Sequence, residues 1–163
     1  MTKVTTTKPE RQDVLGRVRR SYPRLRRILV PLDFSGKSRE ALRFAVPLAA
    51  KFGARLVLLH VLVSKADRAK DKPTPASNPR RTAAHRRLRE TALQYASADL
   101  IEQTVVRAGA PAKEIIEGAR LLGADLLAIT TKGRAGIGRL LKGSVSEYLL
   151  RHAPCPVLTV RKP

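Results

Sequence analysis

The segment Arg55–Leu62, RLVLLHVL, is the feature that most restricts how this chain can fold. It is an almost continuous apolar run of strand length, whereas a strand with one face in water alternates apolar and polar residues. A strand of this kind is covered on both faces, which is typical of parallel sheets flanked by helices. The run therefore predicts a buried strand in an α/β fold.

Further apolar runs alternate with helical patterns along the chain, which predicts a parallel, doubly wound sheet. The first helix is expected to begin at Ser35 or Ser38 and to end at Gly53. Pro47 lies inside it and predicts a kink or a local rearrangement. Its predicted apolar face consists of Ala41, Leu42, Ala45, Leu48, Ala49 and Phe52. The predicted strands are, in chain order, 27–32, 55–62, 100–106, 125–130 and 156–160.

Three more helices complete the pattern. Residues 80–97 predict a basic, solvent-facing helix with weak periodicity, and Pro111 opens a helix that Gly123 ends. The apolar positions of the three helices are Ala83, Leu88, Ala92 and Tyr95, then Ile115, Ile116, Ala119 and Leu122, then Val145, Tyr148 and Leu149.

The chain has 163 residues and a formal charge of +20, with the basic residues concentrated in segments 1–27 and 65–90. Such segments attract polyanions through counterion release, in a strongly salt-dependent way. The alternative is a solvated basic surface, which the lack of interleaved aromatic residues favours. We predict a partly flexible basic extension over 1–25 and one domain over 26–162, with a basic loop and helix inserted at 64–97.

Several classes of protein are excluded by what the sequence lacks. No apolar run approaches the roughly 20 residues that span a bilayer, so membrane insertion is not expected. The N-terminal segment has no apolar core typical of a secretory signal. A single cysteine, Cys155, cannot form an internal disulfide and is expected to be a small buried hydrophobe. A cytoplasmic location is the expectation.

The segment after the fourth predicted strand has the character of an anion site. Gly133 and Gly143 bracket a basic interval, and Ser144 follows at the start of a helix. Glycine lets backbone amides approach an anion, and a helix start directs unpaired N–H groups toward it. Asp33, Val61 and Thr130 lie at the ends of three predicted strands. Because ligands of doubly wound sheets sit beyond the carboxyl ends of the strands, these residues are expected at one crevice.

Five segments together resemble the universal stress protein family, over roughly residues 25–161. They are VPLDFS (30–35), LLHV (58–61), GAPAKEI (109–115), KGRAG with a later GS (132–136, 143–144) and HAPCPVLTV (152–160). The resemblance implies a Rossmann-like sheet similar to that of adenine nucleotide alpha hydrolases, with five parallel strands in the order 3-2-1-4-5. It also implies a homodimer that pairs through strand 156–160. The alternative is that a loop or the N-terminal extension covers this apolar edge.

ATP-binding members carry a Gly-x-x-Gly motif followed, nine residues later, by Gly-Ser or Gly-Thr. Here Thr130 replaces the first glycine, and its side chain either crowds the ribose or donates a hydrogen bond to it. By this resemblance Asp33 and Val61 line the adenine, Ile129 and Thr130 the ribose, and Gly133, Gly143, Ser144 and the Val145 amide the phosphates. Lys132 would neutralise the terminal phosphate, with Mg²⁺ held mainly by phosphate oxygens and water.

The resemblance implies ATP binding, although AMP or a cyclic nucleotide would suit the same motif. No residue is evident that would orient an attacking water, so a regulatory protein rather than an enzyme is expected. The alternatives are a stress protein that acts only through protein contacts, a polyanion-binding protein, and an ATPase or phosphotransferase. His60 is expected to be a packed or hydrogen-bonded core residue, and no metal-ligating cluster or catalytic cysteine constellation is evident.

Overall fold

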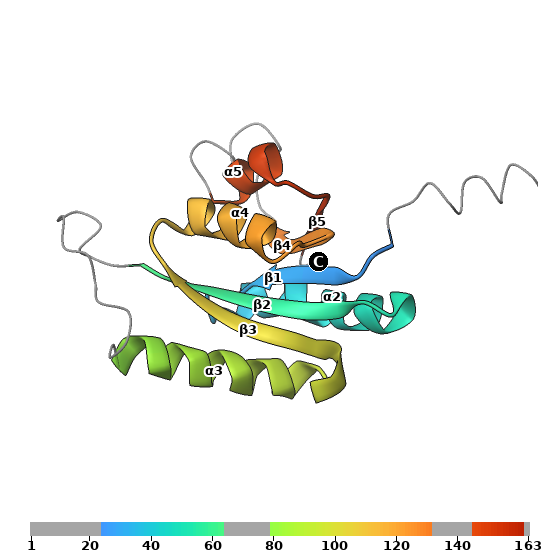
Figure 1. The fold of residues 1–163 in the computed structure, drawn as a ribbon, viewed down its shortest axis with the longest axis horizontal. Coiled ribbons are helices and arrows are strands. Elements are labelled where there is room, and N and C mark those ends of the chain that lie inside the picture. The colour runs from blue at the N-terminus through green and yellow to red at the C-terminus, as the bar shows by residue number, and fades with distance from the viewer. Residues whose placement is uncertain (1–23, 64–78, 132–144, 162–163) are drawn as a thin grey trace, which may run out of the picture.

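The computed structural model describes residues 24–63, 79–131 and 145–161, which form a parallel five-stranded sheet (Figure 1). The strand order is β3-β2-β1-β4-β5, and every neighbouring pair is parallel. The predicted order and the five predicted strands are thereby confirmed. The strands are β1 (Arg27–Pro31), β2 (Arg55–Leu62), β3 (Ile101–Ala108), β4 (Leu126–Thr131) and β5 (Val157–Arg161).

Helices cover both faces of the sheet and divide the core into two clusters. One face packs against α2 and α3, around Ile28, Val30 and Leu58. The other packs against α4 and α5, around Leu29, Leu59 and Leu127. Alternate residues of β1 thus enter opposite clusters, as a strand buried on both faces requires. The helices are α2 (Gly36–Phe52), α3 (Pro79–Tyr95), α4 (Pro111–Leu121) and α5 (Val145–His152), with a short 3₁₀ turn, η2 (Ala98–Leu100).

Helix α2 begins and ends as its sequence predicts, but its face differs in one position. The Ser35 side chain accepts a hydrogen bond from the Ser38 amide and caps the helix, and Gly53 ends it at φ 65°. The helix continues through Pro47 to its end. Phe52 was expected on the buried face and is 58% exposed, because it is the last residue of the helix.

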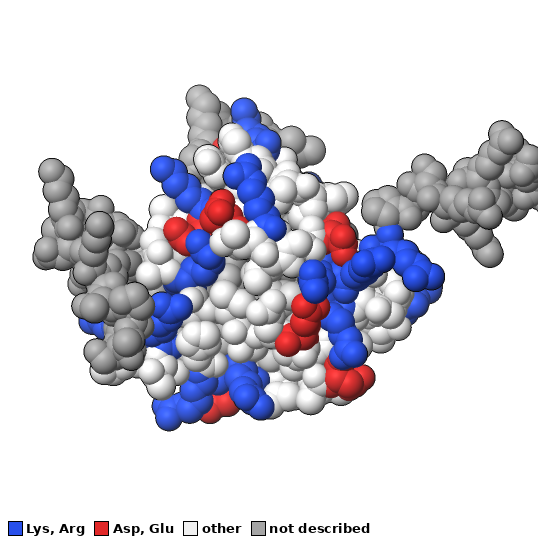
Figure 2. Space-filling model, viewed as in Figure 1, with Lys and Arg blue, Asp and Glu red and all other residues white. Residues whose placement is uncertain are grey.

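Helix α3 is basic and largely exposed, as predicted, and it packs against β2 and β3. It buries Ala84, Leu88, Thr91 and Ala92, whereas the predicted Ala83 is exposed. The first buried position of the helix is therefore Ala84 instead of Ala83. The sequence pattern does not distinguish these two adjacent alanines. On the face drawn in Figure 2, basic side chains lie over several elements, with acidic side chains between them.

Cys155 and His60 are both only partly buried. Cys155 is half-buried, rather than fully buried as predicted, and burial together with nearby Asp125 raises the pKa of its thiol. His60 is partly buried, and its Nδ1 atom lies 2.6 Å from the Leu32 carbonyl oxygen. The prediction of a hydrogen-bonded histidine is confirmed.

None of the helices in the described ranges is long and apolar enough to cross a membrane.

Candidate functional site

The chain reverses its winding direction between β1 and β4, and these two strands separate toward their carboxyl ends. They pair at Ile28–Leu126 and Leu29–Leu127. Beyond these positions β1 continues beside β2, and β4 continues beside β5 as far as Thr131. Pro31, which ends β1, has no N–H group to donate to a neighbouring strand. A crevice therefore opens at the switch point, where doubly wound sheets bind ligands.

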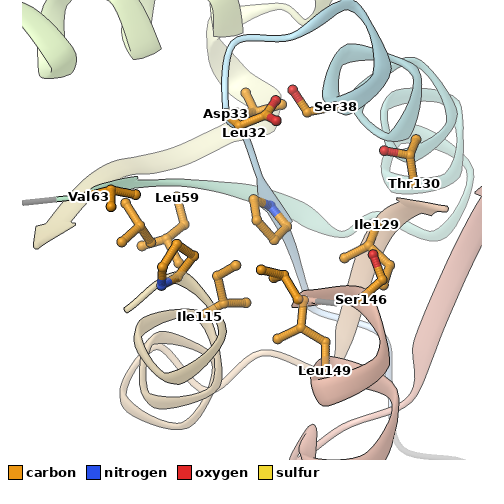
Figure 3. A pocket seen from close by; sticks show the side chains of 14 residues that line it. Leu32, Asp33, Ser38, Leu59, Val63, Ile115, Ile129, Thr130, Ser146 and Leu149 are labelled. Atoms are coloured by element: carbon orange, nitrogen blue, oxygen red, sulfur yellow. The ribbon is translucent and has the colours of Figure 1, made fainter. Parts of the chain in front are cut away.

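A cavity of about 290 Å³ occupies this crevice (Figure 3). Asp33 and Ser38 lie on one side of it, while Ile115 and Leu149 lie on another. Most of the lining is apolar, and the polar side chains among the described residues come from aspartate, serine and threonine. The lining residues are Pro31, Leu32, Asp33, Ser38, Leu59, Val61, Val63, Pro111, Ile115, Ile129, Thr130, Val145, Ser146 and Leu149.

Five of the nine predicted site residues line this cavity: Asp33, Val61, Ile129, Thr130 and Val145. They come from the ends of three strands and the start of α5, so the tertiary structure brings together residues from four separate segments. The other four predicted residues, Lys132, Gly133, Gly143 and Ser144, lie outside the described residues, and their predicted roles stay predictions.

Sequence reasoning missed several lining residues, of which Ser38, Pro111 and Ser146 belong to first turns of helices. The signal was available, because a helix that follows a strand of a parallel sheet starts at the carboxyl edge of that sheet. Val63 and Ile115 were also missed as site residues. Ile115 carried no separate signal, since its apolar character only marked it as part of the helix core.

Asp33 lies two residues after the end of β1, and its carboxylate is held by the turn that follows. Its Oδ1 atom accepts a hydrogen bond from the Ser35 amide at 2.9 Å. Burial raises the pKa of the Asp33 carboxyl, but hydrogen bonds from Ser35 and Ser38 outweigh this effect and the net pKa is lowered. The carboxylate is therefore ionised at neutral pH and acts as a hydrogen-bond acceptor at the edge of the cavity.

Phe34 follows Asp33 and has a backbone φ of 63°, in the left-handed region. This conformation costs a residue with a Cβ about 1–2 kcal/mol. The Phe34 ring contacts the His60 ring at a centroid distance of 4.2 Å. The Arg87 guanidinium lies 4.4 Å from the centroid of the same Phe34 ring. Residues of β2 and α3 thus contact the turn that carries Asp33.

The first turn of α5 lies at the opposite border of the cavity, where Val145 and Ser146 contribute to the lining. Backbone N–H groups in a first helical turn lack intrahelical partners and favour negative charge. The site thus combines an apolar surface suited to a planar ring, hydroxyl groups suited to a sugar, and a helix start suited to phosphate. In the part of the chain that the structure describes, no group of three metal-ligating side chains occurs.

Comparison with known proteins gives a consistent family assignment. The model of the universal stress protein family matches residues 24–161. A universal stress protein of Methanocaldococcus jannaschii is 31% identical over 144 residues, which are 85% of this chain and 83% of the relative. One from Thermus aquaticus is 31% identical over 134 residues, which are 82% and 97% of the two chains.

Solved structures give the same result. A universal stress protein in complex with cAMP shares 26% identity and a TM-score of 0.60, over 83% of this chain and 95% of that one. The universal stress protein UspA from Lactobacillus plantarum shares 27% identity and a TM-score of 0.59, over 86% and 100%. The family match over residues 24–161 and the identity to these relatives show that the chain belongs to the universal stress protein family.

Proposed function

We propose that this protein binds ATP in the cavity between β1 and β4, as a ligand or regulatory cofactor of a stress response. The observation that carries the proposal is the composition of the cavity wall. An apolar surface lies beside an ionised carboxylate at one end, and a helix start lies at the other. An adenine nucleotide has the same sequence of parts, namely an aromatic base, a sugar and a chain of phosphates.

The base would lie against Val61 and Leu59, with its exocyclic amino group donating to the Asp33 carboxylate. The ribose would lie against Ile129 and Thr130. The Val145 amide at the start of α5 would donate a hydrogen bond to a phosphate oxygen. The related structure in complex with cAMP, at 26% identity, supports an adenine-containing ligand. By the family resemblance Lys132, Gly133, Gly143 and Ser144 would complete the phosphate site.

We further propose a binding protein rather than an enzyme. Among the described lining residues Asp33 is the one carboxylate, and it already accepts hydrogen bonds from the turn that caps α2. A second carboxylate to hold a metal ion or to orient a water does not occur in that lining. Mg²⁺ would be bound mainly by phosphate oxygens and water, and hydrolysis would be slow or absent.

The cytoplasmic homodimer is part of the same proposal. Strand β5 lies at the edge of the described sheet, with β4 on one side and no strand on the other. Exposed apolar edge strands promote aggregation unless they are paired. Pairing of Val157–Arg161 with the same strand of a second copy would satisfy both edges by two-fold symmetry.

Calorimetric titration with MgATP tests the nucleotide proposal. We expect one site per chain and an increase in melting temperature, because a ligand that binds the folded state stabilises it. Asp33→Ala should weaken ATP binding at least tenfold, whereas Phe52→Ala, an exposed residue at the opposite end of α2, should leave it unchanged. Absence of both heat and thermal shift at millimolar MgATP would disprove the proposal and favour a stress protein that acts only through protein contacts.

The basic side chains of helix α3 support a second candidate function, the binding of polyanions. Five of its first eleven residues are arginines, at 80, 81, 86, 87 and 89, and the helix contains one acidic residue, Glu90. Filter binding of a DNA duplex at increasing salt tests this candidate. Affinity that falls steeply with salt, and falls further in Arg81→Gln/Arg89→Gln, would support it, whereas salt-independent or absent binding would exclude it.

A further inference from the structure

We infer that Phe34 is a positioning residue of the nucleotide site, because its ring, held by His60 and Arg87, keeps the Asp33 carboxylate at the edge of the cavity. The inference rests on the proposed function, and it adds residues of β2 and α3 to the site. Neither Phe34 nor Arg87 lines the cavity itself. Both act through the turn between β1 and α2.

The backbone on either side of Asp33 is anchored at different elements. Before it, the Leu32 amide donates a hydrogen bond to the Leu59 carbonyl at 2.8 Å, and the Leu32 carbonyl accepts one from the His60 ring. After it, Ser35 caps α2. Phe34 is the residue between these anchors whose φ is positive, so the direction of the chain through the turn depends on maintaining that conformation.

The Phe34 side chain supplies the contacts that maintain it. The His60 ring lies 4.2 Å from the Phe34 ring, with an angle of 35° between the planes. The Arg87 guanidinium lies over the Phe34 ring at 4.4 Å, a distance at which a cation and an aromatic face attract each other. The histidine belongs to a central strand and the arginine to a helix packed on the sheet, so both contacts are made to the rigid part of the fold.

The chemical consequence concerns selectivity for the base. An ionised carboxylate accepts hydrogen bonds and does not donate them. Asp33 therefore favours adenine, which carries an amino group at position 6, over hypoxanthine, which carries a carbonyl oxygen there. If Phe34 acts by orienting Asp33, its loss reduces the affinity for ATP and leaves the weaker affinity for ITP nearly unchanged. A variant that damages the whole cavity would weaken both nucleotides equally.

The test compares MgATP and MgITP binding to the wild type, Phe34→Leu, Arg87→Gln, Asp33→Ala and the double variant Phe34→Leu/Asp33→Ala. Leucine retains apolar volume, so the fold should persist. We expect Phe34→Leu to weaken ATP about tenfold and ITP less than twofold, and Arg87→Gln to weaken ATP about two- to fivefold. The double variant should bind ATP no more weakly than Asp33→Ala. Phe52→Leu is the matched control.

A readout without nucleotide uses the carboxyl carbon of Asp33, followed by NMR against pH. In Phe34→Leu the pKa of this carboxyl should move up toward its ordinary value, because the turn no longer holds its hydrogen bonds. Equal loss of ATP and ITP, additivity with Asp33→Ala, or an unchanged Asp33 titration would each overturn the inference. A wild type that binds neither nucleotide would instead refute the proposed function, while the NMR titration would still report whether Phe34 orients Asp33.

Discussion

The Oδ1 atom of Asp33 accepts a hydrogen bond from the backbone amide of Ser35, at 2.9 Å, in the turn between β1 and α2. The same Ser35 caps α2 through its side chain, which accepts from the Ser38 amide at 3.2 Å. The residue proposed to select the base is therefore fixed to the start of a helix. Movement of this carboxylate and fraying of α2 are expected to be linked, because one turn holds both.

The lowered pKa of Asp33 predicts a pH-dependent contribution to stability. A carboxyl whose pKa is lower in the folded than in the unfolded protein stabilises the fold fully above its unfolded pKa, about 3.9. This contribution is lost as the pH falls through the folded pKa. In urea unfolding, the wild type should exceed Asp33→Asn in stability at pH 6, and the difference should shrink between pH 4 and the acid limit. A difference that grows on acidification would contradict the assignment.

Thr130 is predicted to donate its hydroxyl to the ribose, rather than to obstruct it. Thr130 lies in β4, pairs with Val160 of β5, and lines the cavity. Thr130→Val retains the shape of the side chain and removes the hydroxyl, so ATP should bind about two- to tenfold more weakly, as expected for one hydrogen bond. Thr104→Val in β3, outside the cavity, is the calorimetric control. Unchanged or tighter binding by Thr130→Val would favour crowding of the sugar.

Leu127 should be among the most costly residues to truncate. It lies in β4, is 0% exposed, and belongs to the core cluster between the sheet and helices α4 and α5. Leu127→Ala should lower the free energy of unfolding by about 2–5 kcal/mol, because it leaves a cavity in a packed core. Leu121→Ala, at a position 67% exposed, should change it by less than about 0.5 kcal/mol. Similar losses from both variants, measured by urea unfolding, would refute this account of the core.

The free edge of β5 predicts which residue controls the proposed dimer. The Leu127 amide donates to the Pro156 carbonyl, so in the regular parallel pattern Leu158 and Val160 also bond toward β4. The N–H group of Thr159 therefore points to the free edge. Thr159→Pro should convert dimers to monomers in sedimentation velocity, since proline cannot donate to a paired strand. Thr159→Ala should remain dimeric, and a wild type that sediments as a monomer would exclude the pairing.

The elements of the fold were predictable because their signals are local. The apolar run of β2 and the cap at Ser35 each depend on a few neighbouring residues, and both appear where predicted. The errors occurred where local signals are ambiguous. Ala83 and Ala84 are equivalent in pattern, and the packing of α3 on the sheet decides between them. Phe52 fits the period of α2, but the helix ends at this residue and leaves it exposed.

The candidate site divides in the same way. Residues at strand ends, such as Asp33 and Thr130, were predictable, because in a parallel sheet all carboxyl ends lie at one edge. A signal also existed for Ser38 and Ser146, which lie in first turns of helices, whereas the contributions of Val63 and Ile115 depended on how the elements pack around the crevice. The chain alone thus specified its strands, helices and family through short-range patterns. The cavity and the contacts of Phe34 with His60 and Arg87 were decided by tertiary packing. They join residues that are far apart in the sequence, and no local sequence pattern predicts such contacts.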